Sequence, residues 1–219
     1  MEPFGVHRGR VALLDWADVN TDLIIPARYL KRIERTGYGP AFFADKRYMP
    51  GGAPEVDDTD RHGGLDPAFP LNELKYKDAS ILLVGRNFGC GSSREHAVWA
   101  VAQAGYRVLI APVKGEGFAD IFEQNAFNNG LLPIEVPQQD WDRLAAAAAA
   151  GSLEAEVDLE SQRITARVRG GDDLVVAFGV PEPQRARLLS GRDTIGETLL
   201  HGAAIDKYER AMPAWAALR

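Results

Sequence analysis

The chain has 219 residues and a formal net charge of −6, which suits one domain with a sizeable core and argues against a nucleic-acid partner, since the basic residues are scattered. Its single cysteine, Cys90, excludes an internal disulfide and cannot alone hold a structural zinc ion or an iron–sulfur cluster, so a reducing, cytoplasmic compartment fits. We expect no signal peptide and no membrane span, because no apolar run is long enough for either.

The first third of the chain carries a weak periodic pattern. The glycines of "RTGYG" at 35–39 interrupt it, and segment 50–70 is rich in glycine, proline and aspartate. We expect segment 50–70 to be an exposed, mobile loop. Elsewhere in this part, the pattern predicts a strand at 11–14 and an Asp/Asn-rich loop at 15–22. Two short helices are predicted after it, at 27–34 and 40–48.

The middle of the chain alternates between buried strands and helices. Continuous apolar runs predict strands at 79–85, 106–111 and 131–136. Between them, helices are predicted at 94–104, closed by Gly105, and at 118–129, closed by Gly130. This β-α-β-α-β order favours a parallel sheet.

The last part changes to an antiparallel pattern. An alanine-rich helix at 140–150 is followed by alternating strands at 153–159 and 162–168, which read as a hairpin, and 173–179 adds a third strand. The spacing of Thr194 and Glu197 predicts a capping box for a closing helix over 194–210. The whole chain, 1–219, is predicted to be a single mixed α/β domain.

The stretch "RNFGCGSSREH" at 86–96 is the strongest candidate for a site. It connects a predicted buried strand to a helix, and ligands of open α/β sheets bind at that end of the strands. Free N–H groups at the helix start, glycines that let a ligand approach the main chain, and the forked donor of Arg94 together suit a carboxylate or a phosphate. The structural alternative is a capping box in which Ser92 and Glu95 only begin the helix.

Several better-known motifs are absent from this stretch. After Gly89 and Gly91 the third glycine of a dinucleotide fingerprint is missing, and no Gly-Lys-Ser/Thr follows as in a P-loop. The Gly-x-Ser-x-Gly pattern of a nucleophile elbow is also absent.

The run "GCGSSREH", followed by "FADIF" and "NNGLLP", resembles the small-subunit family of 3-isopropylmalate dehydratase, within the aconitase superfamily. "NTDLIIP" at 20–26, "RTGYG" at 35–39 and "DTIGETL" at 193–199 are also similar to motifs of that family. The resemblance therefore covers nearly the whole chain. It implies an aconitase-swivel-like β/β/α domain, with a partly parallel central sheet and flanking helices.

The resemblance also implies an activity that this chain performs only with a partner. 2-Isopropylmalate loses water to give isopropylmaleate, and water returns at the neighbouring carbon to give 3-isopropylmalate, in leucine biosynthesis. A [4Fe–4S] cluster acts as Lewis acid, and it is expected on a large subunit rather than on this chain. The expected partners are that cluster-bearing subunit and a small dicarboxylate substrate, with no metal, nucleic acid or membrane bound here.

By the family pattern, Ser92 is the residue that removes the proton next to a substrate carboxylate. Arg94 corresponds to a carboxylate-binding arginine and Ser93 to a supporting hydrogen-bond donor. The helix start and Arg94 would stabilise the serine alkoxide. Cys90 is expected to be a packed small residue, because aconitase carries a glutamate at the matching place.

The segment 35–39 is the candidate for selecting the isopropyl group, with Arg35, Thr36 and Tyr38 as the substrate-binding residues; Tyr38 suits plain packing equally well. His96 is expected to be a buried, hydrogen-bonded structural residue rather than a base. Asp22 either orients the cleft or closes an Asx turn in "NTD".

One departure from the family pattern leaves alternatives open. "VKGEG" at 113–117 replaces an expected serine before Phe118, so the second helix should lack its N-cap, and substrate preference or partner contacts could differ. A homoaconitase-like or methylmalate-type dehydratase subunit is one alternative reading. A non-catalytic carboxylate-binding module is another, and a phosphate-binding enzyme is the weakest.

Overall fold

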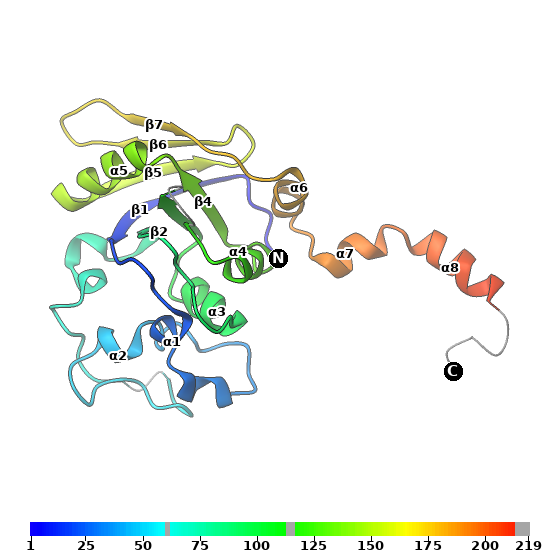
Figure 1. Ribbon diagram of the computed structural model, residues 1–219, viewed down its shortest axis with the longest axis horizontal. Coiled ribbons are helices and arrows are strands. Elements are labelled where there is room, and N and C mark those ends of the chain that lie inside the picture. The colour runs from blue at the N-terminus through cyan, green and yellow to red at the C-terminus, as the bar shows by residue number, and fades with distance from the viewer. Residues whose placement is uncertain (60–61, 113–116, 213–219) are drawn as a thin grey trace.

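A seven-stranded mixed sheet organises the residues that the structure, a computed structural model, describes: 1–59, 62–112 and 117–212. The strand order is β4-β3-β2-β1-β5-β6-β7 (Figure 1). The first four strands run parallel, and every pairing from β1 through β5 and β6 to β7 is antiparallel. The strands are β1 Val6–Leu14, β2 Ala79–Val84, β3 Val108–Pro112, β4 Leu132–Val136, β5 Leu153–Asp158, β6 Arg163–Arg167 and β7 Leu174–Ala177.

The parallel half of the sheet is buried on both faces. In β2, Leu82 and Val84 contact one hydrophobic core, while Ile81 and Leu83 contact the other. This two-sided burial explains the continuous apolar runs of the sequence, and it confirms the predicted parallel β-α-β-α-β unit. The predicted antiparallel hairpin and third strand are also confirmed, as β5, β6 and β7.

Helices cover the sheet from both sides. Side chains of α1, α3 and α4 enter one core, and side chains of α5 and α6 enter the other (Figure 1). The helices are α1 Thr21–Ile24, α2 Ala44–Arg47, α3 Glu95–Gln103, α4 Asp120–Asn128, α5 Gln138–Ala150, α6 Glu182–Ser190, α7 Thr194–Leu199 and α8 Gly202–Ala211, with 3-10 turns η1 Ala27–Lys31, η2 Pro70–Asn72 and η3 Leu74–Tyr76.

One prediction for the first third of the chain is wrong, and another holds only in part. The helix expected at 27–34 is only the 3-10 turn η1, because Ile33 is 95% exposed and shares no buried face with the residues before it. Segment 50–70 is irregular, but it is not simply exposed. Pro54 and Thr59 are buried, and the buried ring of Phe69 lies 5.7 Å from that of Trp16. Residues 60–61 fall outside the described chain.

Two predicted capping boxes are also wrong. Arg94, with an extended backbone, is the N-cap of α3, so Ser92 lies outside the helix. The closing helix is divided into α7 and α8, and its N-cap is Asp193 rather than Thr194; the Asp193 carboxylate accepts from the Gly196 N–H at 2.7 Å. Helix α6 was not predicted, because Leu188 is its one fully buried residue and the apolar pattern is correspondingly weak.

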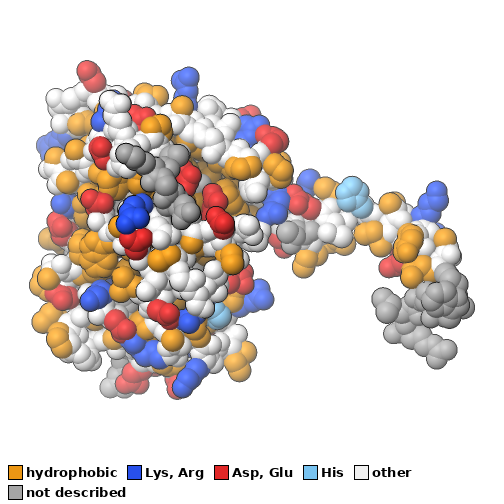
Figure 2. All heavy atoms as spheres, viewed as in Figure 1, with side chains coloured by type: hydrophobic (Ala, Val, Ile, Leu, Met, Phe, Trp, Pro, Cys, Tyr) orange, Lys and Arg blue, Asp and Glu red, His pale blue; other side chains and the backbone are white. Residues whose placement is uncertain are grey.

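Helices α7 and α8 form an arm that extends away from the rest of the molecule (Figure 1). The chain leaves the body at Gly191, which has a left-handed backbone (φ 67°) and accepts a hydrogen bond from the Met1 amino group at 3.0 Å. Hydrophobic side chains lie exposed along this arm, as Figure 2 shows, and Ile195, Leu199 and Tyr208 are among them. None of the residues of α8 is buried.

Candidate functional site

The serine-containing segment Asn87–Arg94, called here the serine loop, follows the carboxyl end of β2 and leads into α3. Both of its glycines have left-handed backbones, with φ of +82° at Gly89 and +84° at Gly91. A Cβ atom at Gly89 would lie 2.2 Å from the ring of Phe122 in α4. Gly89 is therefore required for packing against α4.

The "NTD" segment, residues 20–22, supports the serine loop through hydrogen bonds. The Thr21 N–H donates to Cys90 O at 3.0 Å, and the Thr21 hydroxyl donates to Ser92 O at 2.6 Å. These contacts hold the main chain of residues 90–92 against the "NTD" segment. The Asn20 side chain accepts from the Leu23 N–H at 2.8 Å and is the N-cap of α1, whereas the Asp22 carboxylate is paired with Arg94.

The side chains that the sequence suggests as reactive or substrate-binding lie at the surface of the serine loop. Ser92 and Ser93 are exposed, and the Arg94 side chain retains 22% of its accessible surface. Arg94 forms an ion pair with Asp22, whose side chain is half exposed. Ser92 and Arg94 thus lie two residues apart in the chain, after the carboxyl end of β2, and both side chains are accessible to solvent.

The second candidate segment lies against the same helix. The Arg35 guanidinium carbon lies 5.5 Å from the centre of the Trp99 ring in α3, and the Tyr38 ring meets the His96 ring edge-on at 5.5 Å. Arg35 and Thr36 are exposed, whereas Tyr38 is fully buried, and its hydroxyl has no hydrogen-bond partner within the described residues. The two candidate segments are therefore brought together by α3.

His96 is a half-buried residue held by aromatic contacts. Its ring lies 4.7 Å from that of Trp99 and also contacts Tyr38. No hydrogen bond reaches the ring from any residue that the structure describes, so the expectation of a buried, hydrogen-bonded histidine is wrong in both respects. Burial lowers the pKa of His96 below its ordinary 6.5, with nearby Arg94 acting in the same direction and Glu95 opposing them. His96 is therefore neutral at neutral pH.

Cys90 lacks the surroundings of a reactive or metal-binding thiol. It is partly buried, and burial raises the pKa of its thiol. Across 1–59, 62–112 and 117–212, no three His, Cys, Asp or Glu side chains gather in a way that could hold a metal ion. A search of the same residues for a helix with the length and apolar character needed to cross a bilayer finds none.

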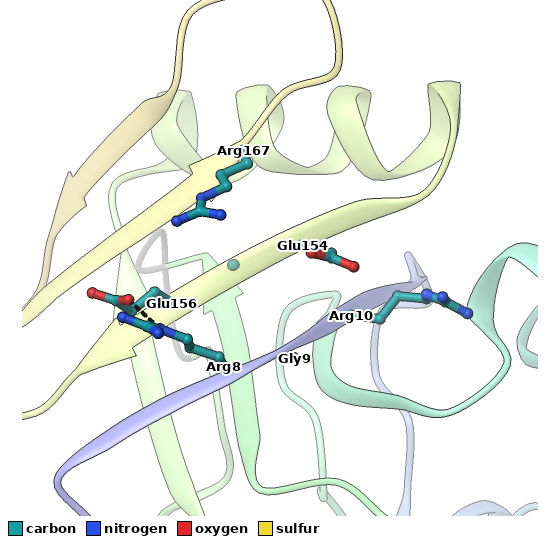
Figure 3. Close-up of a pocket in the computed structure, with 7 residues that line it drawn as sticks. Arg8, Gly9, Arg10, Glu154, Glu156 and Arg167 are labelled. Atoms are coloured by element: carbon teal, nitrogen blue, oxygen red, sulfur yellow. Dashed lines mark hydrogen bonds and ion pairs between the residues drawn. The ribbon is translucent and has the colours of Figure 1, made fainter.

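A cavity of about 200 Å³ lies elsewhere (Figure 3). It is on the open face of the antiparallel half-sheet, beside the first half of β1, whereas the serine loop follows the other end of the parallel strands. Arg8 pairs with Glu156 across neighbouring strands. Such cross-strand pairs stabilise a solvated sheet face, and this cavity contains none of the candidate site residues. Its charged lining residues are Arg8, Arg10, Glu154, Glu156 and Arg167.

Sequence reasoning missed two buried residues that hold the site. Thr21 was taken only as part of a turn, and Thr59 falls in segment 50–70, for which no role was found. Thr59 donates to Gly37 O at 2.7 Å, within the second candidate segment. No local pattern reveals such contacts, because the partners lie 71 residues apart for Thr21 and Ser92, and 22 apart for Thr59 and Gly37. The altered loop at 113–117 lies outside the described residues except for Gly117.

Comparisons with known proteins agree with this arrangement. The family model "Aconitase C-terminal domain" matches residues 1–139. The 3-isopropylmalate dehydratase small subunit of Bacillus licheniformis is 45% identical over 215 residues, 98% of each chain. That of Methylibium petroleiphilum is 48% identical over 210 residues, 95% of this chain and 93% of the relative.

A solved structure shares the fold. The crystal structure of 3-isopropylmalate dehydratase from Methanocaldococcus jannaschii superposes with a TM-score of 0.60 and 26% sequence identity. The superposition covers 93% of this chain and 99% of the other. The expected swivel-type fold with a partly parallel sheet is confirmed.

Proposed function

The chain belongs to the family of 3-isopropylmalate dehydratase small subunits, within the aconitase superfamily. From this premise we propose that it provides part of the active site that interconverts 2-isopropylmalate and 3-isopropylmalate through isopropylmaleate. The observation that carries the proposal is the serine loop, which follows the carboxyl end of β2, with Ser92 exposed and Arg94 partly exposed, in a fold shared with that family. The product serves leucine biosynthesis.

Ser92 is proposed to remove the proton from the carbon next to a substrate carboxylate. A serine hydroxyl is a weak base unless its alkoxide is stabilised. The unpaired N–H groups at the start of α3 and the Arg94 guanidinium lie next to it in the chain, and both favour negative charge. Charge also grows on the substrate carboxylate as the proton leaves, so donors such as Ser93 bind the transition state more tightly than the substrate.

Arg94 is proposed to bind that carboxylate, with Asp22 fixing the direction of its guanidinium. The Asp22–Arg94 ion pair occupies one edge of the planar guanidinium, which leaves other N–H donors for a ligand. A planar donor held in one orientation matches the two oxygens of a carboxylate. Asp22 therefore aligns Arg94 before the substrate arrives.

The loop that contains Arg35, Thr36 and Tyr38 is proposed to select the alkyl group of the substrate. Arg35 and Thr36 are exposed beside α3, where they can reach a ligand held by the serine loop. The buried ring of Tyr38 suits a supporting role, since it anchors the loop on His96.

The iron–sulfur cluster that the family implies does not fit this chain. Such clusters are held by several cysteine thiolates, and Cys90 is the only cysteine of the sequence. We therefore assign the cluster to a large-subunit partner. The single cysteine and the biosynthetic role also favour a cytoplasmic location.

A Ser92→Ala variant, assembled with the large subunit, tests the proposal. We expect the rate of isopropylmaleate hydration to fall about 10²–10⁴-fold, because a positioned proton-transfer group contributes about that much. The melting temperature and the co-purification of the two subunits should stay unchanged, because Ser92 is exposed. Ser152→Ala, which removes another exposed serine, is the matched control and should retain full activity. Near-normal turnover by Ser92→Ala would refute the assignment.

A further inference from the structure

Two threonines with buried side chains, Thr21 and Thr59, hold the two loops of the proposed site. Thr21 is 0% exposed and Thr59 is 4% exposed. Each donates its hydroxyl hydrogen to a main-chain carbonyl, Thr21 to Ser92 of the serine loop and Thr59 to Gly37 of the alkyl-selecting loop. A buried polar side chain destabilises the fold unless it is hydrogen-bonded, so both residues stand where a specific contact is made.

The Thr59 hydroxyl is used both as a donor and as an acceptor. It donates to Gly37 O at 2.7 Å and accepts from Arg32 Nη1 at 2.8 Å. The Arg32 guanidinium carbon in turn lies 5.6 Å from the centre of the Tyr38 ring. Thr59 therefore connects the entry of the alkyl-selecting loop, at Arg32, with its turn at Gly37.

The loop has little freedom to move away from this contact. Gly37 has a left-handed backbone (φ +84°), and a Cβ atom there would lie 2.8 Å from Arg32 Nη2 and 3.2 Å from Thr59 Oγ1. On the other side, the Gln103 side chain of α3 accepts from the Tyr38 N–H and donates to Arg35 O, both at 2.8 Å. Gln103 and Thr59 thus both form hydrogen bonds to the main chain of the loop, while Arg35 and Thr36 stay exposed.

Thr59 is itself held in place by the segment that carries it. The buried Pro54 accepts a hydrogen bond from the Tyr29 hydroxyl at 2.6 Å, which ties the segment to the turn η1 just before Arg32. We propose that Thr59 is a positioning residue for substrate selection, acting through Gly37 and Arg32 to set where Arg35 and Thr36 meet the alkyl group. The proposal rests on the proposed function of that loop, and it gives a part of segment 50–70 a role.

The test compares Thr59→Val with Thr59→Ser in the two-subunit complex. Valine keeps the shape of threonine but removes both hydrogen bonds, whereas serine keeps the hydroxyl. Kinetics are measured with 3-isopropylmalate and with 3-methylmalate, in which a methyl group replaces the isopropyl group. For Thr59→Val we expect KM for 3-isopropylmalate to rise about tenfold with kcat within about threefold, since misplaced alkyl contacts weaken binding rather than proton transfer.

The preference for 3-isopropylmalate over 3-methylmalate, as a ratio of kcat/KM values, should fall by a similar factor in Thr59→Val and return in Thr59→Ser. Thr165→Val, on β6 in the antiparallel half of the sheet, is the matched control and should change neither value. A preference that Thr59→Val leaves intact, or an equal loss of kcat with both substrates, overturns the proposal.

The stability of each Thr59 variant is measured as well, because the effect of changing a buried residue can be on folding alone. Thr59→Ala serves as a second variant, since it leaves space instead of burying a methyl group against polar atoms. If both Val and Ala variants fail to fold while Ser folds, Thr59 is a stability residue and the proposal is overturned. If the wild-type complex does not hydrate isopropylmaleate at all, the proposed function itself falls, which separates the two failures.

Discussion

At the scale of single residues, Gly89 and Gly170 show that the same backbone angle can arise for different reasons. Their φ angles are +82° and +79°. A Cβ atom at Gly170 would meet nothing within 4 Å, whereas one at Gly89 would overlap the ring of Phe122. Of these two glycines, Gly89 alone is required by packing as well as by backbone conformation. That packing fixes the serine loop on α4.

We predict that Gly89→Ala lowers the free energy of unfolding by about 2–5 kcal/mol, the sum of left-handed strain and overpacking. Gly170→Ala, the matched control, should cost only about 1–2 kcal/mol, because it adds strain without a clash. Urea denaturation of both variants measures the difference. Equal losses in the two variants would show that the contact with Phe122 imposes no packing requirement at Gly89.

At the scale of secondary-structure elements, α4 begins without a side-chain cap. Its N-cap is Ala119, whose backbone is extended and whose side chain offers no acceptor. The sequence pattern places the missing serine directly before Phe118, at position 117, but the helix begins later, so that position is two residues before the actual N-cap. Because Ala119 is only partly buried, a hydroxyl placed there is not forced into the apolar core.

We predict that Ala119→Ser raises the free energy of unfolding by about 0.5–2 kcal/mol, because the serine oxygen can accept from one of the free N–H groups of the first turn. The same change at Ala146, exposed in the middle of α5, should lower it by about 0.5 kcal/mol through helix propensity. Opposite signs in chemical denaturation are the expected result. A loss at Ala119 would mean that the start of α4 cannot accommodate the hydroxyl.

How far the sequence predicts these elements depends on where their side chains lie. β2, β3 and β4 were found because both of their faces are buried, which leaves unbroken apolar runs. The first half of β1 was missed because its Arg8 and Arg10 face the open side of the sheet. α6 was missed because it is fixed by few buried groups, and its N-cap, Pro181, makes no side-chain cap contact.

The candidate site follows the same logic. The sequence predicted that Ser92 and Arg94 follow a buried strand, and the structure places them after β2, with Ser92 exposed and Arg94 partly exposed. It did not reveal that Asp22 pairs with Arg94, or that Thr59 supports Gly37, because these contacts join segments distant in the chain. Residue types and local spacing indicate a chemistry, whereas the residues that hold the site emerge only from tertiary packing.

At the scale of the whole molecule, the body and the arm differ in what holds them. The body ends with α6, whose Leu188 is fully buried and accepts a hydrogen bond from the Phe4 N–H at 2.8 Å. Beyond Gly191 the arm contacts the body through a weak ion pair, in which Arg187 Nε lies 4.0 Å from Glu197 Oε2. A surface ion pair of that kind contributes at most about 1 kcal/mol.

We therefore predict that a chain lacking residues 193–219 melts within about 2–4 °C of the full chain, since about 1 kcal/mol corresponds to that shift in a domain of this size. A chain lacking residues 182–219 should melt far lower, because it also loses Leu188 and its contact with Phe4. Thermal circular dichroism distinguishes the two truncations. A large shift for the shorter deletion would show that the arm packs on the body.

The position of β1 between the two halves of the sheet bears on how the protein is made. β1 is synthesised well before its antiparallel partner β5, Leu153–Asp158. At about 5–20 residues per second, synthesis of the chain between them takes on the order of ten seconds. Throughout that interval one edge of β1 stays open to other nascent chains, so the order of translation, and not only the native contacts, governs how safely this sheet assembles.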